Sequence, residues 1–220
     1  MRTLPICLAV LAAVALTAHA DPAQDPDRRY QALLAEAKAQ APAADWLALR
    51  IAFSQRRDFR VISRSAARVR MLEAADKGDC SGALPSAKTV LEENYVDIDA
   101  HMIAAWCEDA ADQGAAARLD RDIGAGLAKS IETVDGLSPA NAFIPIDVDE
   151  EYALMRALGR KVTGQILVED GGHSYDSLAT VDEKGRVATY YFLVDRLLAQ
   201  EAAGLQPGAV TEGGPPSRTP

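Results

Sequence analysis

The fold is decided by residues 78–131, which read GDCSGALPSAKTVLEENYVDIDAHMIAAWCEDAADQGAAARLDRDIGAGLAKSI. Apolar side chains recur in this stretch every three or four residues, the spacing that gathers them on one face of a helix. They are Leu84, Ala87 and Leu91, then Ile98, Met102 and Ala105, then Leu119, Ile123, Leu127 and Ile131. Short turns at 78–81, 95–97 and 113–114 separate these runs, so we expect antiparallel helical hairpins.

The two hairpins also repeat in sequence. Ala83 and Ala117 are 34 residues apart, and each lies near the start of a second helix after a turn that contains Gly or Asp. This is the period of tetratricopeptide repeats, although such arrays usually need three or more repeats. The sequence therefore predicts a tetratricopeptide-like helical region.

Working outward toward the N-terminus, the same spacing predicts three more helices. The first begins at Arg28 and stops before Pro42, the second carries Trp46 and Phe53, and the third covers about 62–77. We assign residues 21–135 to a region of helical hairpins.

Toward the C-terminus the pattern changes to short strands. We expect an edge strand at 143–146, a helix over about 149–158 capped by Asp149, and a strand at 165–168. A hairpin of 175–181 and 186–194 follows, and then a helix over 194–203. The predicted fold class is therefore α+β and mainly α, with a small α/β region at 136–203 and a disordered tail at 204–220.

The first twenty residues predict export. Arg2 precedes an apolar run, Ile6 to Leu16, and Ala18-His19-Ala20 ends in small residues at −3 and −1, as in a secretory signal peptide. We expect cleavage before Asp21 and a periplasmic or secreted product. No other apolar stretch approaches eighteen residues, so we expect no membrane insertion after cleavage. The net charge of −9 argues against binding to nucleic acid or to anionic lipid.

Cys80 and Cys107 remain after this cleavage. An even number of cysteines in an exported protein predicts one disulfide, which would stabilise the fold by roughly 3–4 kcal/mol. The alternative is two buried free thiols.

Several short motifs occur in an order that resembles one family. They are Asp45 to Arg50, Gly78-Asp79-Cys80, Asn94 to His101, Asp149 to Tyr152, Gly164-Gln165 and His173 to Asp176. Over roughly residues 45–195 the chain is similar to the exported bacterial family of domain of unknown function 4919. The resemblance implies a layer of helical hairpins followed by a small α/β end. It implies no established activity, so it assigns no catalytic residues.

Motifs with a known chemistry are missing. The sequence has no Gly-x-Ser-x-Gly, phosphate loop, His-Glu-x-x-His or Cys-x-x-Cys, and only two histidines follow the signal peptide. We therefore assign no catalytic, cofactor-binding or metal-binding residue, and expect no cofactor.

Two polar clusters keep an enzymatic alternative open. Asp147, Asp149, Glu150 and Glu151 are oxygen ligands of the type that Ca²⁺ prefers, but capping and the first turn of a helix explain them better. His173 with Ser174 and Asp176 is a nucleophile–base set in composition. Neighbours on one strand rarely reach the geometry of a triad, however, so we favour a role in the turn.

Two further groups have both a structural and a functional interpretation. His101 stands four residues after Asp97, which predicts a local ion pair, whereas Asp97 or Asp99 can simply cap the helix. Arg60, Arg64 and Arg68 lie at helical spacing, with Arg56, Arg57 and Arg70 nearby. They can form a surface for an anionic ligand or partner, a solvated face, or ion pairs with the acidic C-terminal part.

The sequence thus favours a non-enzymatic module of the bacterial envelope that binds a protein or peptide. The alternatives are an envelope hydrolase that uses His173 with Asp176 or the Asp147–Glu151 carboxylates, and a structural protein without a ligand.

Overall fold

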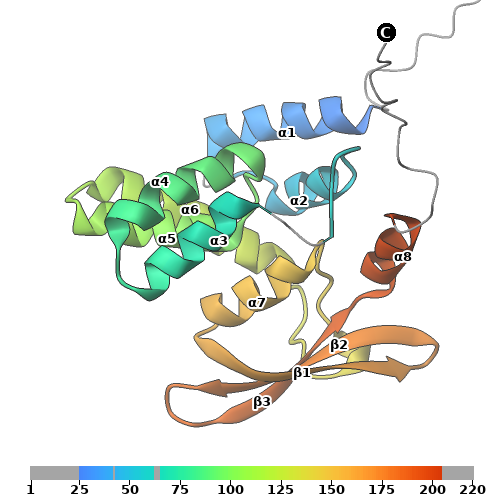
Figure 1. Cartoon of the computed structure of the whole chain (residues 1–220). Helices are drawn as coiled ribbons and strands as arrows, with labels where there is room; N and C mark the ends of the chain where they lie inside the picture. Colours follow the sequence, from blue (N-terminus) through green and yellow to red (C-terminus); the bar gives the residue numbers. More distant parts are fainter. Residues whose placement is uncertain (1–24, 42, 62–64, 205–220) are drawn as a thin grey trace, which may run out of the picture.

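The computed structural model describes residues 25–41, 43–61 and 65–204, so the predicted signal peptide and residues 205–220 of the predicted tail lie outside it. Helices and strands of the described residues follow one another as shown in Figure 1. They are α1 (Pro26–Gln40), α2 (Trp46–Ser54), α3 (Ala66–Asp76), α4 (Cys80–Glu93), α5 (Ile98–Ala110), α6 (Gly114–Ile131), the 3-10 turn η2 (Pro139–Asn141), α7 (Val148–Ala157), β1 (Arg160–Asp170), β2 (His173–Asp182), β3 (Val187–Leu193) and α8 (Asp195–Gly204).

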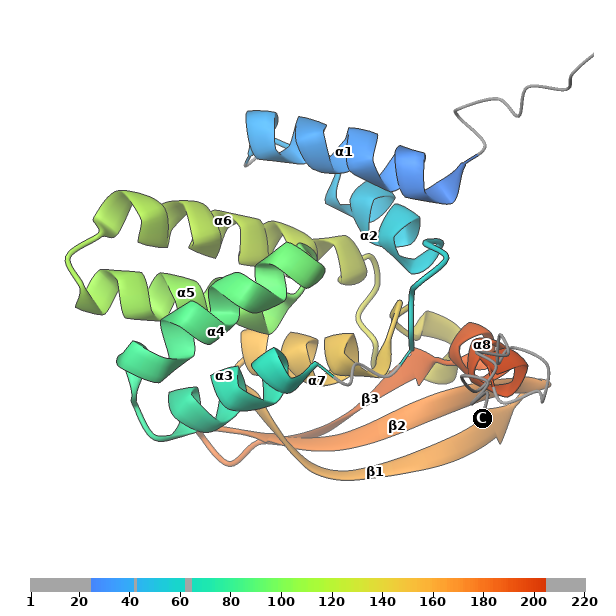
Figure 2. The same cartoon turned by 45° about the horizontal axis from the view of Figure 1, so that its top comes forward.

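The helices α1 to α6 form a layer above a three-stranded antiparallel sheet of order β1-β2-β3, and α7 lies between the two (Figures 1 and 2). One hydrophobic core crosses this arrangement, because Leu49 of α2 and Leu127 of α6 belong to the same buried cluster as Leu154 of α7 and Phe192 of β3. A smaller cluster around Met71 lies among α3, α4 and α5. The predicted α+β, mainly α class is confirmed.

Side-chain caps fix where most of these helices begin. Asp45, Ser65, Asp79 and Asp97 each accept a hydrogen bond from a backbone N–H in the first turn of α2, α3, α4 and α5. The predicted cap of α7 is wrong by two residues. Asp147, in an extended backbone conformation, caps this helix by accepting a hydrogen bond from the Glu150 N–H at 2.8 Å.

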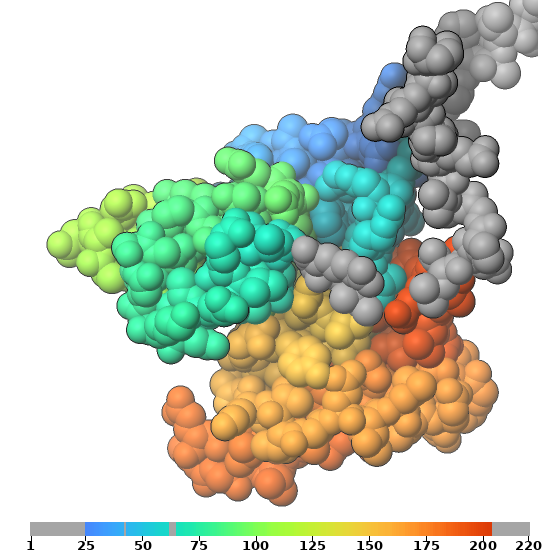
Figure 3. Space-filling view, in the orientation of Figure 1, coloured from blue at the N-terminus to red at the C-terminus, as the bar shows by residue number. Residues whose placement is uncertain are grey.

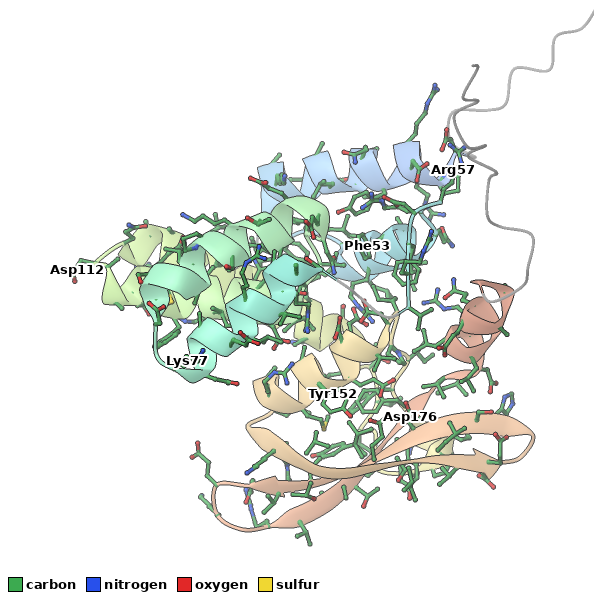
Figure 4. All side chains as sticks on the ribbon, viewed as in Figure 1. Phe53, Arg57, Lys77, Asp112, Tyr152 and Asp176 are labelled. Carbon is green, nitrogen blue, oxygen red and sulfur yellow. A yellow bond between two sulfur atoms is a disulfide. The ribbon has the colours of Figure 1, made fainter. Side chains whose placement is uncertain are left out.

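The two helical hairpins turn in the same way. Gly78 and Asp112, 34 positions apart, both have a left-handed backbone, with φ of 70° and 57°. The residue after each donates its N–H to a carbonyl five residues earlier: Asp79 to Ala74, and Gln113 to Glu108. Figure 4 shows both turns on the same side of the helical layer, where Lys77 and Asp112 are labelled. The 34-residue period in the sequence therefore corresponds to a repeated local geometry.

A disulfide joins the two hairpins. Cys80 is the first residue of α4 and Cys107 lies in the last turn of α5, with Cα atoms 5.2 Å apart. The predicted pairing is confirmed.

Two strand predictions need correction. The expected edge strand at 143–146 is reduced to one bridge between Phe143 and Phe192. Pro145 has no N–H, and the Ile146 N–H donates to the Glu150 carboxylate, so neither can extend the ladder. The strand expected at 165–168 runs from Arg160 to Asp170, with a bulge between Val162 and Gly164.

A buried ion pair connects the helical layer to α7. Arg50 of α2 binds Glu150 of α7 through two hydrogen bonds of 2.6 Å, and both side chains are buried. The remaining Arg50 donors reach the Ser130 hydroxyl and carbonyl and the Ile144 carbonyl. All three nitrogens of this guanidinium therefore donate hydrogen bonds to acceptors within the protein.

Removing one partner of this pair should strongly lower the stability of the folded protein. We expect Arg50→Met to lower the free energy of unfolding by about 3–5 kcal/mol, because the Glu150 carboxylate stays buried without its cation. Urea denaturation measures the loss. The double variant Arg50→Met/Glu150→Leu should regain most of it, since both charges of this pair are removed and neither is left buried alone.

The exposed pair Arg121–Asp109 is the matched control, and Arg121→Met should change stability by at most about 1 kcal/mol. Equal losses in the two arginine variants would contradict the importance of burial.

Candidate functional site

Of the three arginines predicted to form a partner surface, Arg68 points into the protein. Arg68 is buried, and its guanidinium donates to Asp97 at 2.9 Å and to Asp99 at 2.7 Å. Its third nitrogen lies 3.1 Å from Asp149 of α7. Arg60 is exposed and precedes α3, while Arg64 lies outside the described residues. Arg68 therefore takes the internal pairing that was the alternative, because three carboxylates from two other helices surround it.

His101 has a different partner from the predicted one. Its Nδ1 lies 2.6 Å from Asp120 of α6, and its Nε2 lies 2.9 Å from the carbonyl oxygen of Tyr95. Asp97 instead caps α5 through the Ala100 N–H at 2.9 Å. The histidine is buried and joins two helices, so it has no open face for chemistry.

The hydrolase alternative is not assembled among the described residues. His173 Nδ1 lies 2.6 Å from the carboxylate of Asp195, the first residue of α8. The same carboxylate accepts a hydrogen bond from the Ser174 N–H. Asp176 accepts a hydrogen bond from Gln165 of β1 at 2.7 Å instead. His173 and Asp176 are three residues apart on β2 and so belong to opposite faces of the sheet.

The four carboxylates at 147–151 also diverge. Asp147 caps α7, Asp149 contacts Arg68, and Glu150 contacts Arg50. In the part of the chain that the structure describes, no group of three or more His, Cys, Asp or Glu side chains is arranged to hold a metal ion. Three of the carboxylates are thus structural.

The fourth, Glu151, belongs to a polar chain that sequence reasoning missed. Its side chain is fully buried, and neither oxygen accepts a hydrogen bond from a donor among the described residues. Burial, and then the charge of Asp176 on β2, raise the pKa of Glu151 to about 9. At neutral pH Glu151 is therefore an acid that donates its proton in a hydrogen bond to Asp176.

The polar chain of side chains that begins at Glu151 continues to the surface. Asp176 binds the Gln165 amide, and the Tyr152 hydroxyl donates to the amide oxygen of Gln165. Figure 4 shows Tyr152 on α7 and Asp176 on β2 in the space between helix and sheet. The period-two pattern of β2 was the available signal, because it places Asp176 on the same face as the buried Leu178. These hydrogen-bonded side chains hold α7 against the sheet.

An apolar groove lies on the other side of α7. It has a volume of about 350 Å³ and is lined mainly by apolar side chains. They are Leu72, Ala75, Ile98, Met102, Ile103, Trp106, Ala153 and Ala157, from α3, α5 and α7. Figure 3 shows this face hollowed between the teal α3 and the orange sheet, with the yellow α7 between them.

The groove leaves large apolar side chains open to solvent. Trp106 is 44% exposed and Met102, four residues earlier on α5, is 38% exposed. Asp76 and Arg156 also line the groove, and Arg156 pairs with Asp99. Exposed apolar side chains gathered along a hollow with a few charged groups are typical of an interaction site.

Comparison with known proteins identifies the family. A family model described as a domain of unknown function (DUF4919) matches residues 51–203. The chain belongs to this family. No curated protein and no solved structure matches the DUF4919 chain significantly. Among its described residues, no helix combines the length and the apolar character needed to cross a membrane.

The buried acid of this DUF4919 protein predicts a dependence of stability on pH. Above about pH 4.5 the unfolded chain loses the Glu151 proton, whereas the folded chain keeps it until about pH 9. The folded state therefore binds more protons over this range, and the free energy of unfolding should fall as the pH rises through it.

Glu151→Gln should remove this contribution, because an amide N–H can donate to Asp176 without titrating. We expect the variant to be about 1–3 kcal/mol more stable than the wild type at pH 8, and to show a smaller difference near pH 4. Urea denaturation between pH 4 and pH 9 tests this. The exposed Glu183→Gln is the control and should follow the wild type; the same pH profile for Glu151→Gln would refute the buried acid.

Proposed function

We propose that this DUF4919 protein is an exported, non-enzymatic module that binds a segment of another envelope protein in its apolar groove. The observation that carries the proposal is the pair Met102 and Trp106, one helical turn apart and half exposed along the groove. Tryptophan is enriched among the residues that dominate binding energy, and methionine adapts to different partners.

Export has two independent supports. The first twenty residues have the composition of a signal peptide. The disulfide between Cys80 and Cys107 is of the kind that persists in oxidising compartments.

The helical layer supports a role as a scaffold. Its two hairpins repeat with a 34-residue period and equivalent turns at Gly78 and Asp112, as in tetratricopeptide-like stacks. Stacks of helix pairs commonly present extended binding surfaces. The non-enzymatic part of the proposal is supported by His101, His173 and the 147–151 carboxylates, whose contacts are those of structural groups.

The chemistry of the groove suggests its occupant. Apolar walls favour an aliphatic or aromatic side chain as an anchor. Asp76 is exposed and contacts no basic side chain among the described residues, so it can receive a lysine or arginine. The net charge of −9 also attracts a basic partner. The proposed ligand is therefore a peptide segment with an apolar anchor next to a basic residue.

Selection of phage-displayed random peptides on the folded, oxidised protein tests this function. We expect enriched peptides to combine an aromatic or aliphatic residue with Lys or Arg. Trp106→Ala should weaken their binding about 30-fold, the loss typical of an interfacial tryptophan. Asp76→Lys should shift the selection away from basic residues.

Leu119→Ala is the matched control. Leu119 is 48% exposed on the neighbouring helix α6 but does not line the groove, so its replacement should leave peptide binding unchanged. Circular dichroism confirms that each variant is folded. Failure to enrich any peptide, or equal losses for Trp106→Ala and Leu119→Ala, would refute the groove as the binding site.

A further inference from the structure

The two edge strands of the sheet differ in whether their outer backbone groups are paired. The outer edge of β3 is covered by the segment before α7: Phe143 donates its N–H to the Tyr191 carbonyl at 2.9 Å, and Tyr191 donates to the Gly136 carbonyl at 2.8 Å. The outer edge of β1 pairs with no strand among the described residues. Figure 2 shows β1 as the outermost strand on that side. Its unpaired backbone groups can therefore accept another strand.

The free edge is long and apolar in its middle. β1 contains 11 residues, compared with 7 in β3. Ile166 is 64% exposed and Leu167 is 53% exposed, and as neighbours on a strand they point to opposite faces of the sheet. A strand added at this edge would cover apolar surface on both faces.

The charges of β1 lie at its ends and have opposite signs. Arg160 and Lys161 come five and four residues before Gln165, and Glu169 and Asp170 come four and five residues after it. Lys161 and Asp170 are exposed, and neither contacts an oppositely charged side chain among the described residues. The edge is therefore basic at one end, uncharged in the middle and acidic at the other end.

This arrangement is self-complementary in one orientation. An antiparallel copy of the same strand, related by a two-fold axis near Gln165, brings the basic end of each strand to the acidic end of the other. A parallel copy places like charges together, which is unfavourable. The bulge before Gly164 shifts the backbone register by one residue, and two adjacent charges at each end tolerate that shift.

We propose that β1 pairs antiparallel with β1 of a second copy of this chain, forming a homodimer with one continuous six-stranded sheet. This interface is separate from the apolar groove, whose residues come from α3, α5 and α7. The charges at the ends also discourage unrelated strands, which would not supply the matching pattern.

Sedimentation equilibrium of the wild type over a series of concentrations measures this dimer. We expect a monomer–dimer equilibrium that weakens as the salt concentration rises, because charge pairs at the ends of β1 contribute. Lys161→Glu and Glu169→Lys should each weaken the dimer about tenfold or more, because Lys161 of one copy lies opposite Glu169 of the other and each change creates two like-charge contacts across the axis.

An equimolar mixture of these two variants provides the decisive measurement. In the mixed dimer one end keeps its natural charges, and at the other end the pair of Lys161 with Glu169 has its two charges exchanged, so the mixture should dimerise about as well as the wild type. Lys184→Glu, in the exposed turn between β2 and β3, is the control and should leave the dimer unchanged.

A wild type that stays monomeric would overturn the proposal, and so would variants that dimerise normally or a mixture that does not recover. Peptide binding in the apolar groove is measured separately through Trp106→Ala, so either result can fail without the other.

Discussion

The ion pair between Arg50 and Glu150 is the interaction on which the rest of the structure depends. It connects α2 to α7, and its remaining donors reach Ser130 of α6 and the carbonyl of Ile144. The Glu150 carboxylate also accepts the Ile146 N–H, so the chain that leads into α7 is held at the same point. Because a buried charge cannot be left without its partner, the helical layer and the sheet with its helix cannot separate at low cost.

Helix α7 then fixes both sides of the candidate site. Toward the helical layer, Asp149 contacts Arg68 of α3, and Arg156 contacts Asp99 of α5. Toward the sheet, Glu151 is held in its neutral form against Asp176, because burial raises its pKa. Charged and polar groups therefore position the walls of the apolar groove. Their hydrogen bonds and ion pairs are made within the protein. Among the described residues, these ionisable side chains therefore hold helices and strands together.

The groove and the free edge of β1 are different kinds of surface. The groove presents side chains, and its selectivity would come from the shape around Trp106 and from the charge of Asp76. The edge presents backbone groups, and its selectivity would come from the charges at the two ends of the strand. They lie on different elements, so the proposed peptide and the proposed second copy of the chain would not compete for one surface.

The sequence by itself determined what depends on neighbouring residues. Periodic apolar side chains predicted the helices, Gly171-Gly172 predicted the turn before β2, and the cysteine count predicted the disulfide. Even the 34-residue period has its counterpart in the matching turns at Gly78 and Asp112. The predictions of helices and turns succeed because hydrogen bonds within these elements span only a few residues, and the disulfide could be predicted because only two cysteines follow the predicted signal peptide.

Only the tertiary structure decided which charges meet. Arg68 pairs with Asp97 and Asp99, which lie 29 and 31 residues away, and Arg50 pairs with Glu150 across 100 residues. Local spacing suggested Asp97 as the partner of His101 and left three alternatives open for the arginines, because a buried charge takes the partner that the packing of distant elements brings to it. Spacing along one helix or strand carries no information about that packing, which is why the candidate site emerged only from the folded chain.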